Sequence, residues 1–241
     1  MISKNEIKEI RALGQKKFRD ERGLFVVEGE KLVAEALKSG FEVVAHYRIE
    51  DIGEEAMSRI SQLTHPSPAL AVVRQHRNES KPVVGAEDLV LALDGIRDPG
   101  NLGTIIRIAD WFGIGQILAS EDTVEVYNPK VVQSTMGAIF RVKIHYCPLA
   151  ETLRSFASRR MTGGAIPVYG TFLEGDNIYE AELSKGGIVV MGSEANGISQ
   201  EVAACITKKL FIPPFPADAR TSESLNVAVA TAITCSEFRR R

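Results

Sequence analysis

Short apolar runs alternate with amphipathic stretches along most of the chain. In the second half these runs lack the polar alternation of a half-exposed strand, which indicates strands covered on both faces. The strands predicted there share this apolar character and cover residues 89–94, 116–119, 141–144, 168–172, 187–192 and 209–212. Helices are predicted after the first, second, third and fifth of these strands and at the carboxyl end of the chain, and the fourth strand leads to the fifth without a helix. Strands and helices in this order predict a mainly parallel α/β sheet.

The first part of the chain predicts a smaller α/β unit. Helices are predicted at residues 4–13, 31–38 and 54–63, and strands at residues 24–29, 42–47 and 70–74. The basic stretch between the first helix and the first strand is predicted to be a turn. Residues 75–87 are polar, with one Pro and one Gly, as is typical of a linker. We therefore predict a first domain at residues 1–76, a linker at 77–87 and a second domain at 88–241.

The stretch from the last strand to the terminal helix carries several strong local signals. Pro213 and Pro214 lack the N–H that a continuing strand would use, so they end the strand. Polar residues follow, with Thr221 or Ser222 as the predicted N-cap of the terminal helix and Glu223 in its first turn. The beginning of that helix is either plain capping or a docking place for an anion.

Two more polar loops follow strands of the same predicted sheet. Residues 95–113 contain Asn101, a predicted N-cap, and Arg107, which is either a functional cation or a surface partner of Asp110. Residues 191–199 place Glu194 between two glycines. Parallel sheets bind ligands beyond the carboxyl ends of their strands, so we expect the three loops to converge on one site.

A dinucleotide-binding fold is an alternative reading of the same glycines. Glu121 follows the second predicted strand of this half, where such a fold places its ribose carboxylate. Gly95, Gly100 and Gly103 do not have the G-x-G-x-x-G spacing, which argues against this alternative.

Composition sets the broad class of the protein. The chain has 241 residues, of which 44% are hydrophobic, enough for two cores. Its beginning has no apolar signal region and no apolar run approaches about 20 residues, so we expect a cytoplasmic protein without membrane insertion. The cysteines, Cys147, Cys205 and Cys235, are widely spaced, and four histidines are scattered, so we expect structural thiols and no metal site.

Basic side chains are concentrated near the start of the chain. Residues 1–78 carry 13 basic and 12 acidic side chains, whereas residues 79–241 carry 16 and 19. Lys16, Lys17, Arg19 and Arg22 form a modest cationic cluster that could contact phosphates of a nucleic acid. The alternative is a solvated charged face.

Three stretches, in order along the chain, resemble motifs of the SpoU (TrmH-like) branch of the SPOUT class of RNA ribose 2′-O-methyltransferases. They are NLGTIIRIA at 101–109, VMGSEANG at 190–197, and IP at 212–213 with SLNVAV at 224–229. Residues 127–142 also look like the family's sequence between the first two motifs. Residues 17–37 are similar to the substrate-binding domain, related to ribosomal protein L30e, that often precedes the catalytic domain. The loop at 214–223 is longer than is common in the family.

The resemblance implies a SPOUT domain whose carboxyl-terminal segment forms a deep trefoil knot. It also implies a homodimer that binds S-adenosylmethionine and methylates a ribose 2′-hydroxyl of structured RNA, either ribosomal or transfer RNA. Cofactor contacts are implied for residues in the loops of the knot: Thr171, Phe172, Leu173, Met191, Gly192, Gly197, Ile212 and Leu225. A non-catalytic RNA-binding protein on the same scaffold is the alternative from another class.

Catalytic roles are implied for Asn101, Arg107, Glu194, Ser224 and Asn226. A guanidinium has a pKa of about 12.5 or more and is a poor base at neutral pH. We therefore expect the arginine to stabilise a developing alkoxide electrostatically, while the other four position it, the loops and the ribose.

Overall fold

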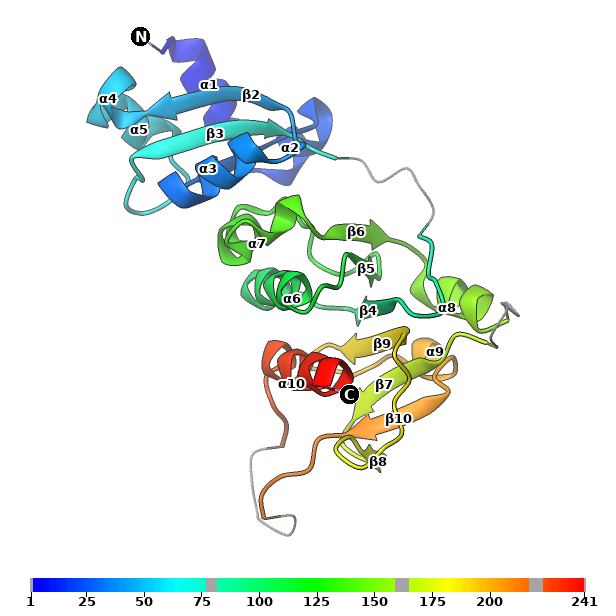
Figure 1. Cartoon of the computed structure of the whole chain (residues 1–241). Helices are drawn as coiled ribbons and strands as arrows, with labels where there is room; N and C mark the ends of the chain where they lie inside the picture. The colour runs from blue at the N-terminus through cyan, green and yellow to red at the C-terminus, as the bar shows by residue number, and fades with distance from the viewer. Residues whose placement is uncertain (1, 77–81, 159–164, 217–222, 241) are drawn as a thin grey trace. The chain divides into compact units, whose positions relative to one another are not determined.

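The computed structural model describes residues 2–76, 82–158, 165–216 and 223–240. The chain divides into two compact units, each described separately here (Figure 1). The first unit comprises residues 1–77 and 125–141, and the second comprises residues 78–124 and 142–241. The division predicted at residues 76 and 88 stays a prediction. The structure adds that residues 125–141, called the inserted segment below, pack with the first unit.

The first unit is built on an antiparallel sheet of three strands in the order β1-β3-β2. Its strands are β1 (Leu24–Glu28), β2 (Val43–Arg48) and β3 (Ala69–Arg74). Its helices are α1 (Lys4–Ala12), α2 (Lys16–Arg22), α3 (Glu30–Lys38), α4 (Ile49–Ile52), α5 (Glu54–Ile60), α7 (Pro129–Thr135) and the 3-10 helix η1 (Ala138–Phe140). The basic stretch between α1 and β1 was predicted to be a turn, but its residues form helix α2. Gly23, in the left-handed conformation, is the C-cap that ends this helix.

Side chains from both faces of this sheet form two cores. On one face, α1 and α5 pack through Ile7, Ile10, Met57 and Ile60. On the other face, α3 and the inserted segment pack against β1 and β3, where Val132 and Ile139 join the core.

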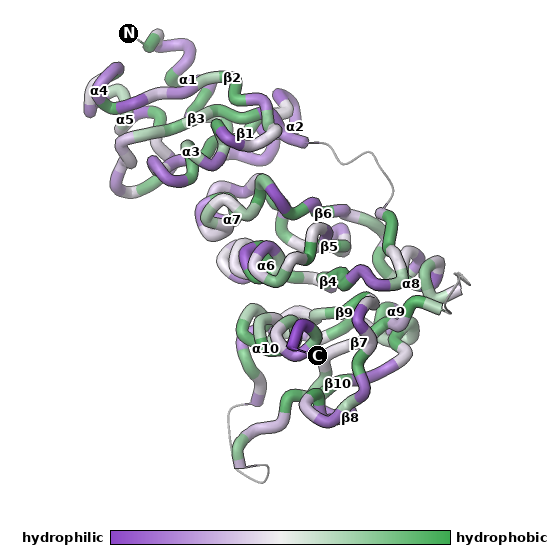
Figure 2. The backbone as a smooth tube through the Cα atoms, viewed as in Figure 1, coloured by the Kyte–Doolittle hydropathy of each residue, from purple (hydrophilic) through white to green (hydrophobic). Residues whose placement is uncertain are grey.

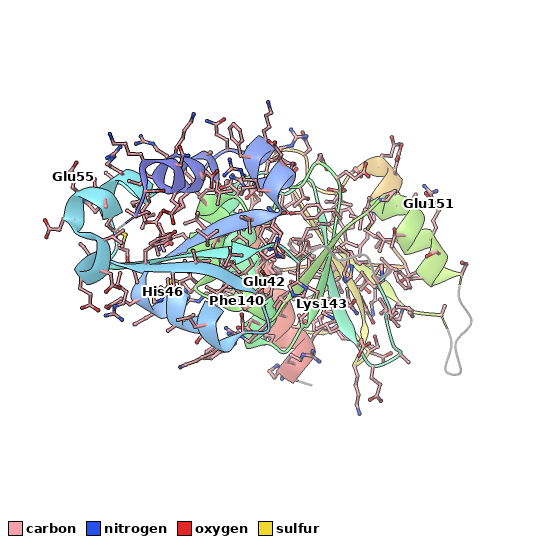
Figure 3. The ribbon with its side chains drawn as sticks, turned by 90° about the horizontal axis from the view of Figure 1, so that it is seen from above. Glu42, His46, Glu55, Phe140, Lys143 and Glu151 are labelled. Atoms are coloured by element: carbon pink, nitrogen blue, oxygen red, sulfur yellow. The ribbon has the colours of Figure 1, made fainter. Side chains whose placement is uncertain are left out.

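Aromatic rings extend this second core. The rings of Phe25 and Tyr127 lie 4.6 Å apart, and Phe140, labelled in Figure 3, packs edge to face on Phe41 at 5.2 Å. The Tyr127 hydroxyl accepts from His76 N at 2.9 Å and donates to His76 O at 3.0 Å. Burial raises the pKa of Tyr127 to about 12. The inserted segment is therefore an integral part of the core of the first unit.

The second unit is a sheet of seven parallel strands in the order β6-β5-β4-β9-β7-β10-β8. Its strands are β4 (Leu89–Asp94), β5 (Gln116–Ala119), β6 (Lys143–Tyr146), β7 (Val168–Phe172), β8 (Asp176–Asn177), β9 (Gly187–Gly192) and β10 (Lys208–Phe211). Its helices are α6 (Pro99–Trp111), α8 (Leu149–Ala157), α9 (Gln200–Ala203) and α10 (Val227–Arg240). The predicted parallel α/β sheet is confirmed.

Helices cover both faces of this sheet, which explains the uniformly apolar central strands (Figures 1 and 2). Alternate residues such as Val90 and Val190 pack with α8 and α9. On the opposite face α6 and α10 pack against each other, and the rings of Tyr169 and Phe238 meet at 5.0 Å. No helix in the described residues is long and apolar enough to cross a membrane.

Two predicted helix starts are wrong. Helix α6 is capped by Asp98, whose carboxylate accepts from Asn101 N at 2.8 Å, with Pro99 in the first turn. Helix α10 begins at Val227 and is capped by Asn226, so Glu223 precedes the helix instead of lying in its first turn. The caps predicted at Thr221 and Ser222 fall outside the described residues. In both cases several polar residues near the helix start compete for one cap, and local sequence does not rank them.

Candidate active site

The carboxyl ends of four neighbouring parallel strands form one edge of the second unit. These strands are adjacent in the order β4-β9-β7-β10, and all run in the same direction. The three polar loops expected to converge follow β4, follow β9, and lie between β10 and α10. Their meeting at one edge is a consequence of the parallel sheet.

The turn from β4 to α6 is held by many hydrogen bonds. Gly95 N donates to Ser120 Oγ at 2.8 Å, Ile96 N donates to Thr123 Oγ1 at 3.2 Å, and Val124 N donates to Ile96 O at 2.8 Å. These three partners belong to residues 120–124, which we call the strap. Because the strap fixes the turn, it also fixes the beginning of α6.

An ion pair reinforces the strap. The carboxylate of Asp122 accepts from Ser120 Oγ at 2.7 Å and pairs with Arg97 Nη2 at 3.2 Å. The hydrogen bond from Ser120 and the neighbouring Arg97 together lower the pKa of Asp122 below its usual value.

The loop after β9 is closed by a small backbone bridge. Ser193 N donates to Gly197 O at 3.0 Å, and Gly197 N donates to Ser193 O at 2.8 Å. A Cβ at Gly192 would lie 2.2 Å from the carbonyl carbon of Gly197, so only glycine permits this close approach. Asp94 joins this loop to the end of β4, because its carboxylate accepts from Ser199 N at 2.7 Å.

Asn101, Glu194 and Asn226 form one hydrogen-bonded group, which we call the polar cluster. Asn101 donates through Nδ2 to Glu194 Oε1, and Asn226 donates through Nδ2 to Asn101 Oδ1 at 3.0 Å. The Asn226 carbonyl oxygen accepts from Ala228 N at 3.0 Å and Val229 N at 3.3 Å. One residue from each of the three loops is therefore brought together in the cluster.

The direction of these hydrogen bonds is fixed. An ionised Glu194 can only accept, so Asn101 must turn its amide nitrogen toward it and its oxygen toward Asn226. Asn226 must then donate, and its own oxygen faces the first turn of α10, where orphan N–H groups need an acceptor. The cluster thus joins two helix starts and one loop in a single arrangement.

Arg107 and Ser224 are the other two predicted catalytic residues. Arg107 is exposed on α6, six positions after Asn101, and therefore lies on a different face of the helix. It makes no hydrogen bond or ion pair with the described part of the chain, so its alternative role as a partner of Asp110 is not seen. Ser224 is exposed two residues before Asn226.

The residues predicted to contact a cofactor lie at the same edge. Thr171 and Phe172 end β7, Met191 and Gly192 end β9, and Ile212 follows β10. Thr171 Oγ1 lies 3.4 Å from Val190 O and 3.7 Å from Met191 Sδ.

Two of the predicted cofactor residues expose apolar side chains to solvent at this edge. Leu173 is 66% exposed and Leu225 is 47% exposed. Apolar side chains beside strand ends fit a flat heterocycle, with backbone groups available to its polar rim.

The residues of the predicted RNA-binding cluster in the first unit differ in their exposure. Lys16 is exposed and pairs with Asp20 at 2.6 Å, Lys17 is exposed, and Arg22 lies 3.9 Å from Glu9. Arg19 is different, because only 2% of its side chain is exposed and it pairs with a carboxylate inside the unit. The prediction that Arg19 contacts phosphates is therefore wrong.

Sequence reasoning missed three acidic residues that support the site. Asp98 caps α6, Asp94 holds the loop after β9, and Asp122 anchors the strap. The first could have been found, because Asp followed by Pro is a strong start signal for a helix. The other two act on residues distant in sequence, and no local signal marks them.

A parallel α/β sheet with three loops bonded together at its carboxyl edge places this chain among the α/β proteins that bind ligands at that edge. The SpoU rRNA Methylase family matches residues 88–236, and the MRM3-like substrate binding domain matches residues 4–72. The chain belongs to the SpoU rRNA methylase family. The resemblance inferred from the three motifs is thereby confirmed, and the dinucleotide-binding alternative loses its support.

Several known proteins are similar to this chain over its whole length. The 23S rRNA (guanosine(2553)-2′-O)-methyltransferase RlmP of Bacillus subtilis (strain 168) is 30% identical, over 98% of this chain and 97% of that protein. The structure of a putative RNA methyltransferase of the TrmH family from Porphyromonas gingivalis has a TM-score of 0.85 and 40% identity, covering 100% and 99%. An AdoMet-bound rRNA methyltransferase from Sinorhizobium meliloti has a TM-score of 0.84 and 30% identity, covering 100% and 97%.

Proposed function

We propose that this protein transfers a methyl group from S-adenosylmethionine to a ribose 2′-hydroxyl of RNA. The observation that carries the proposal is the polar cluster at the carboxyl edge of the sheet, in a chain of the SpoU family. Relatives named as 2′-O-methyltransferases of 23S rRNA support ribosomal RNA as the substrate class. The proposal includes a cytoplasmic location, as bacterial relatives that act on ribosomal RNA suggest.

The strand ends and loops at this edge fit S-adenosylmethionine. Ile212 and Leu225 offer apolar surface for the adenine ring, and the close turn at Gly192 presents backbone groups for polar contacts. When bound, the cofactor supplies a methyl group already activated by a sulfonium. The solved AdoMet complex of the Sinorhizobium meliloti relative supports this cofactor. The trefoil knot implied by the resemblance is part of the same proposal.

The protein's own residues prepare the ribose hydroxyl. Arg107 is the cation that stabilises the developing alkoxide, because at about 4 Å and an effective dielectric near 20 it contributes roughly 4 kcal/mol, or about three pKa units. The released proton passes to water or a phosphate. Asn101, Glu194, Ser224 and Asn226 orient the loops around the ribose, and the strap holds α6 in place.

A homodimer completes the site in this proposal. Arg107 lies on a different face of α6 from Asn101, so a second protomer offers a way to bring a guanidinium to each cluster. Trp111 is 84% exposed on α6 and Val229 is 49% exposed on α10, the two helices that pack against each other. Large exposed apolar side chains on adjacent helices are typical of an interface.

Phosphate contacts are assigned to cations of the first unit that are exposed or, in the case of Arg22, partly exposed. These cations are Lys16, Lys17 and Arg22. Arg19 is not among them, because its side chain is buried. The MRM3-like substrate binding domain matched over residues 4–72 supports RNA binding by this part of the chain.

The test is a methylation assay on the intact protein. The protein is incubated with labelled S-adenosylmethionine and, in separate reactions, ribosomal RNA or transfer RNA that lacks modifications. Nuclease digestion and nucleoside analysis then identify any labelled 2′-O-methyl nucleoside. Label in ribosomal RNA supports the proposal. Tight binding of RNA and cofactor without transfer would identify a non-catalytic RNA-binding protein and refute it.

A further inference from the structure

Phe215 is the most exposed large apolar side chain in the described part of the chain. It is 96% exposed, compared with 84% for Trp111 and 73% for Val83. A ring in this place gains nothing from burial, so the stability of the fold does not account for it. Single exposed apolar side chains are common, and the meaning of this one depends on where it lies.

The ring belongs to the loop between β10 and α10, and both ends of that loop are part of the candidate active site. Phe211 ends β10 at the carboxyl edge of the sheet, and Ile212 is one of the proposed cofactor contacts. At the other end, Asn226 donates to Asn101 in the polar cluster. Four residues span at most about 14 Å, so Phe215 lies within that distance of the end of β10. In Figure 1 the chain runs away from the sheet after β10.

Prolines restrict the backbone on both sides of the ring. Pro213 and Pro214 precede Phe215, and Pro216 follows it. Each proline fixes its own φ and biases the residue before it toward extended conformations. A segment restricted in this way loses little conformational entropy when it binds a partner, so the exposed ring is preorganised for a contact.

Three kinds of partner could cover such a ring: an apolar protein surface, the adenine of the cofactor, or a base of RNA. A protein interface needs a larger apolar patch, and the exposed side chains proposed for one, Trp111 and Val229, lie on α6 and α10. A cofactor pocket encloses most of its ligand, which a ring that is 96% exposed does not do. Stacking on a base needs only one open face of an aromatic ring, so the observations favour a base.

We infer that Phe215 is a specificity-determining residue that stacks on an unpaired base of the RNA substrate, beside the nucleotide whose ribose is methylated. The inference rests on the proposed function, which brings a ribose to this edge of the sheet. A base inside a duplex has both faces covered, so the substrate class is RNA in which a neighbour of the target nucleotide is unpaired. Lys209, on the strand that leads into the loop, adds positive charge for the phosphates, and its ammonium lies 4.9 Å from the centre of the Phe172 ring.

The test uses three substitutions of Phe215 in the intact protein. Phe215→Leu keeps an apolar side chain without aromatic faces, Phe215→Ala removes most of the side chain, and Phe215→Trp keeps an aromatic ring. With ribosomal RNA that lacks modifications, we expect kcat/KM to fall about tenfold or more in Phe215→Leu and Phe215→Ala, mainly through a raised KM. In Phe215→Trp we expect kcat/KM within about threefold of wild type.

Val83→Ala is the matched control. It shortens another exposed apolar side chain of the second unit, and Val83 O accepts from Gln116 at the start of β5, at the amino edge of the sheet. We expect kcat/KM within about twofold of wild type for this variant. Because exposed positions contribute little to stability, thermal unfolding curves of all four variants should match that of wild type. If one aliphatic variant of Phe215 does not fold, the other one carries the test.

Three outcomes overturn the inference directly. Wild-type kcat/KM in Phe215→Leu would mean that an aliphatic side chain serves as well as a ring. Weaker binding of S-adenosylmethionine by Phe215→Leu, measured by calorimetry without RNA, would assign the ring to the cofactor. A change from dimer to monomer in sedimentation of Phe215→Leu would assign the ring to a contact between protomers.

A binding measurement separates this inference from the proposed function, because it needs no methyl transfer. The probes are a short single-stranded oligoadenylate and the same strand paired with oligouridylate. We expect Phe215→Leu to bind the single strand about tenfold more weakly than wild type and the duplex equally well. We also expect the single strand to quench the fluorescence of Phe215→Trp beyond any change that Trp111 shows in wild type.

The two failures then look different. If the wild-type protein methylates no RNA but these binding differences are found, the proposed function fails and the stacking contact stands. If wild type and Phe215→Leu bind the single strand equally and Phe215→Trp is not quenched, the inference is overturned, even where the wild-type protein methylates RNA.

Discussion

The side chain of Asn226 makes two kinds of hydrogen bond, one that caps α10 and one that joins the polar cluster, and one pair of substitutions distinguishes them. Its oxygen caps α10 by accepting from Ala228 N and Val229 N, and its nitrogen donates to Asn101. Asn226→Asp keeps an acceptor for the cap but removes the donor. Asn226→Ala removes both.

The expected stabilities follow from helix capping. Loss of an Asn cap costs about 1 kcal/mol, so Asn226→Ala should lower the free energy of unfolding by about that amount. Asp caps as well as Asn, and its charge at a helix N-terminus contributes about 0.3–1 kcal/mol. Asn226→Asp should therefore be as stable as wild type or slightly more stable.

The expected activities do not follow the stabilities. In Asn226→Asp a carboxylate faces Asn101 Oδ1, and two acceptors repel each other. A flip of the Asn101 side-chain amide does not relieve this, because it would place the Asn101 oxygen against the Glu194 carboxylate. A lost hydrogen bond of about 1.5 kcal/mol corresponds to about a tenfold fall in kcat/KM, and the repulsion adds to it. Chemical denaturation and methylation assays of both variants check this. Wild-type activity in Asn226→Asp would refute the linking role of the polar cluster.

Four other outcomes are expected. Arg107→Ala should abolish methylation while calorimetry shows nearly unchanged affinity for S-adenosylmethionine; retained turnover would remove this arginine from catalysis. Lys16→Gln/Lys17→Gln should weaken RNA binding and reduce the slope of log K against log salt by about 1–2, and an unchanged slope would contradict the phosphate contacts. Trp111→Glu should give monomers by sedimentation, and a persisting dimer would exclude α6 from the interface. Burial raises the pKa of Glu28, so the folded state binds more protons and stability falls as pH rises from the unfolded value of 4.5 through the folded pKa. Glu28→Gln should lack this fall, and parallel pH profiles of the two proteins would contradict it.

Periodicity predicted most strands of the second unit, but it placed β6 two residues too early and β10 one residue too late, and it missed the two-residue strand β8. The predicted ranges match β4, β5, β7 and β9, because strands buried on both faces have a largely apolar pattern. Helix α2 was missed because its charged sequence, KKFRDER, lacks an apolar stripe. Its one inward-facing residue is Arg19, and the apolar stem and buried partner of that arginine replace the usual hydrophobic contact.

The site was predictable to the extent that topology fixes it. Three polar loops after parallel strands had to meet at one edge, and residues of all three are bonded in the structure. The partner of Arg19 could not be predicted, because Glu125 lies 106 residues away and carries no local signal. In the sequence Arg19 looks like any surface cation. Only the folded structure shows that its side chain is buried, whereas those of Lys16 and Lys17 are exposed.

The cap of α6 explains why a wrong local prediction still led to a relevant residue. Asn101 and Asp98 both have side chains that can cap, and one helix start uses only one of them. Because the Asp98 carboxylate accepts from the backbone N of Asn101, the side-chain amide of Asn101 is not needed to cap α6. This side chain can therefore bond across the loops to Glu194 and Asn226. Replacing Asp98 by Ala would therefore do more than remove a cap, since Asn101 would lose the bond that fixes its backbone. Asp98, which sequence reasoning overlooked, thus leaves the side-chain amide of Asn101 available to the polar cluster.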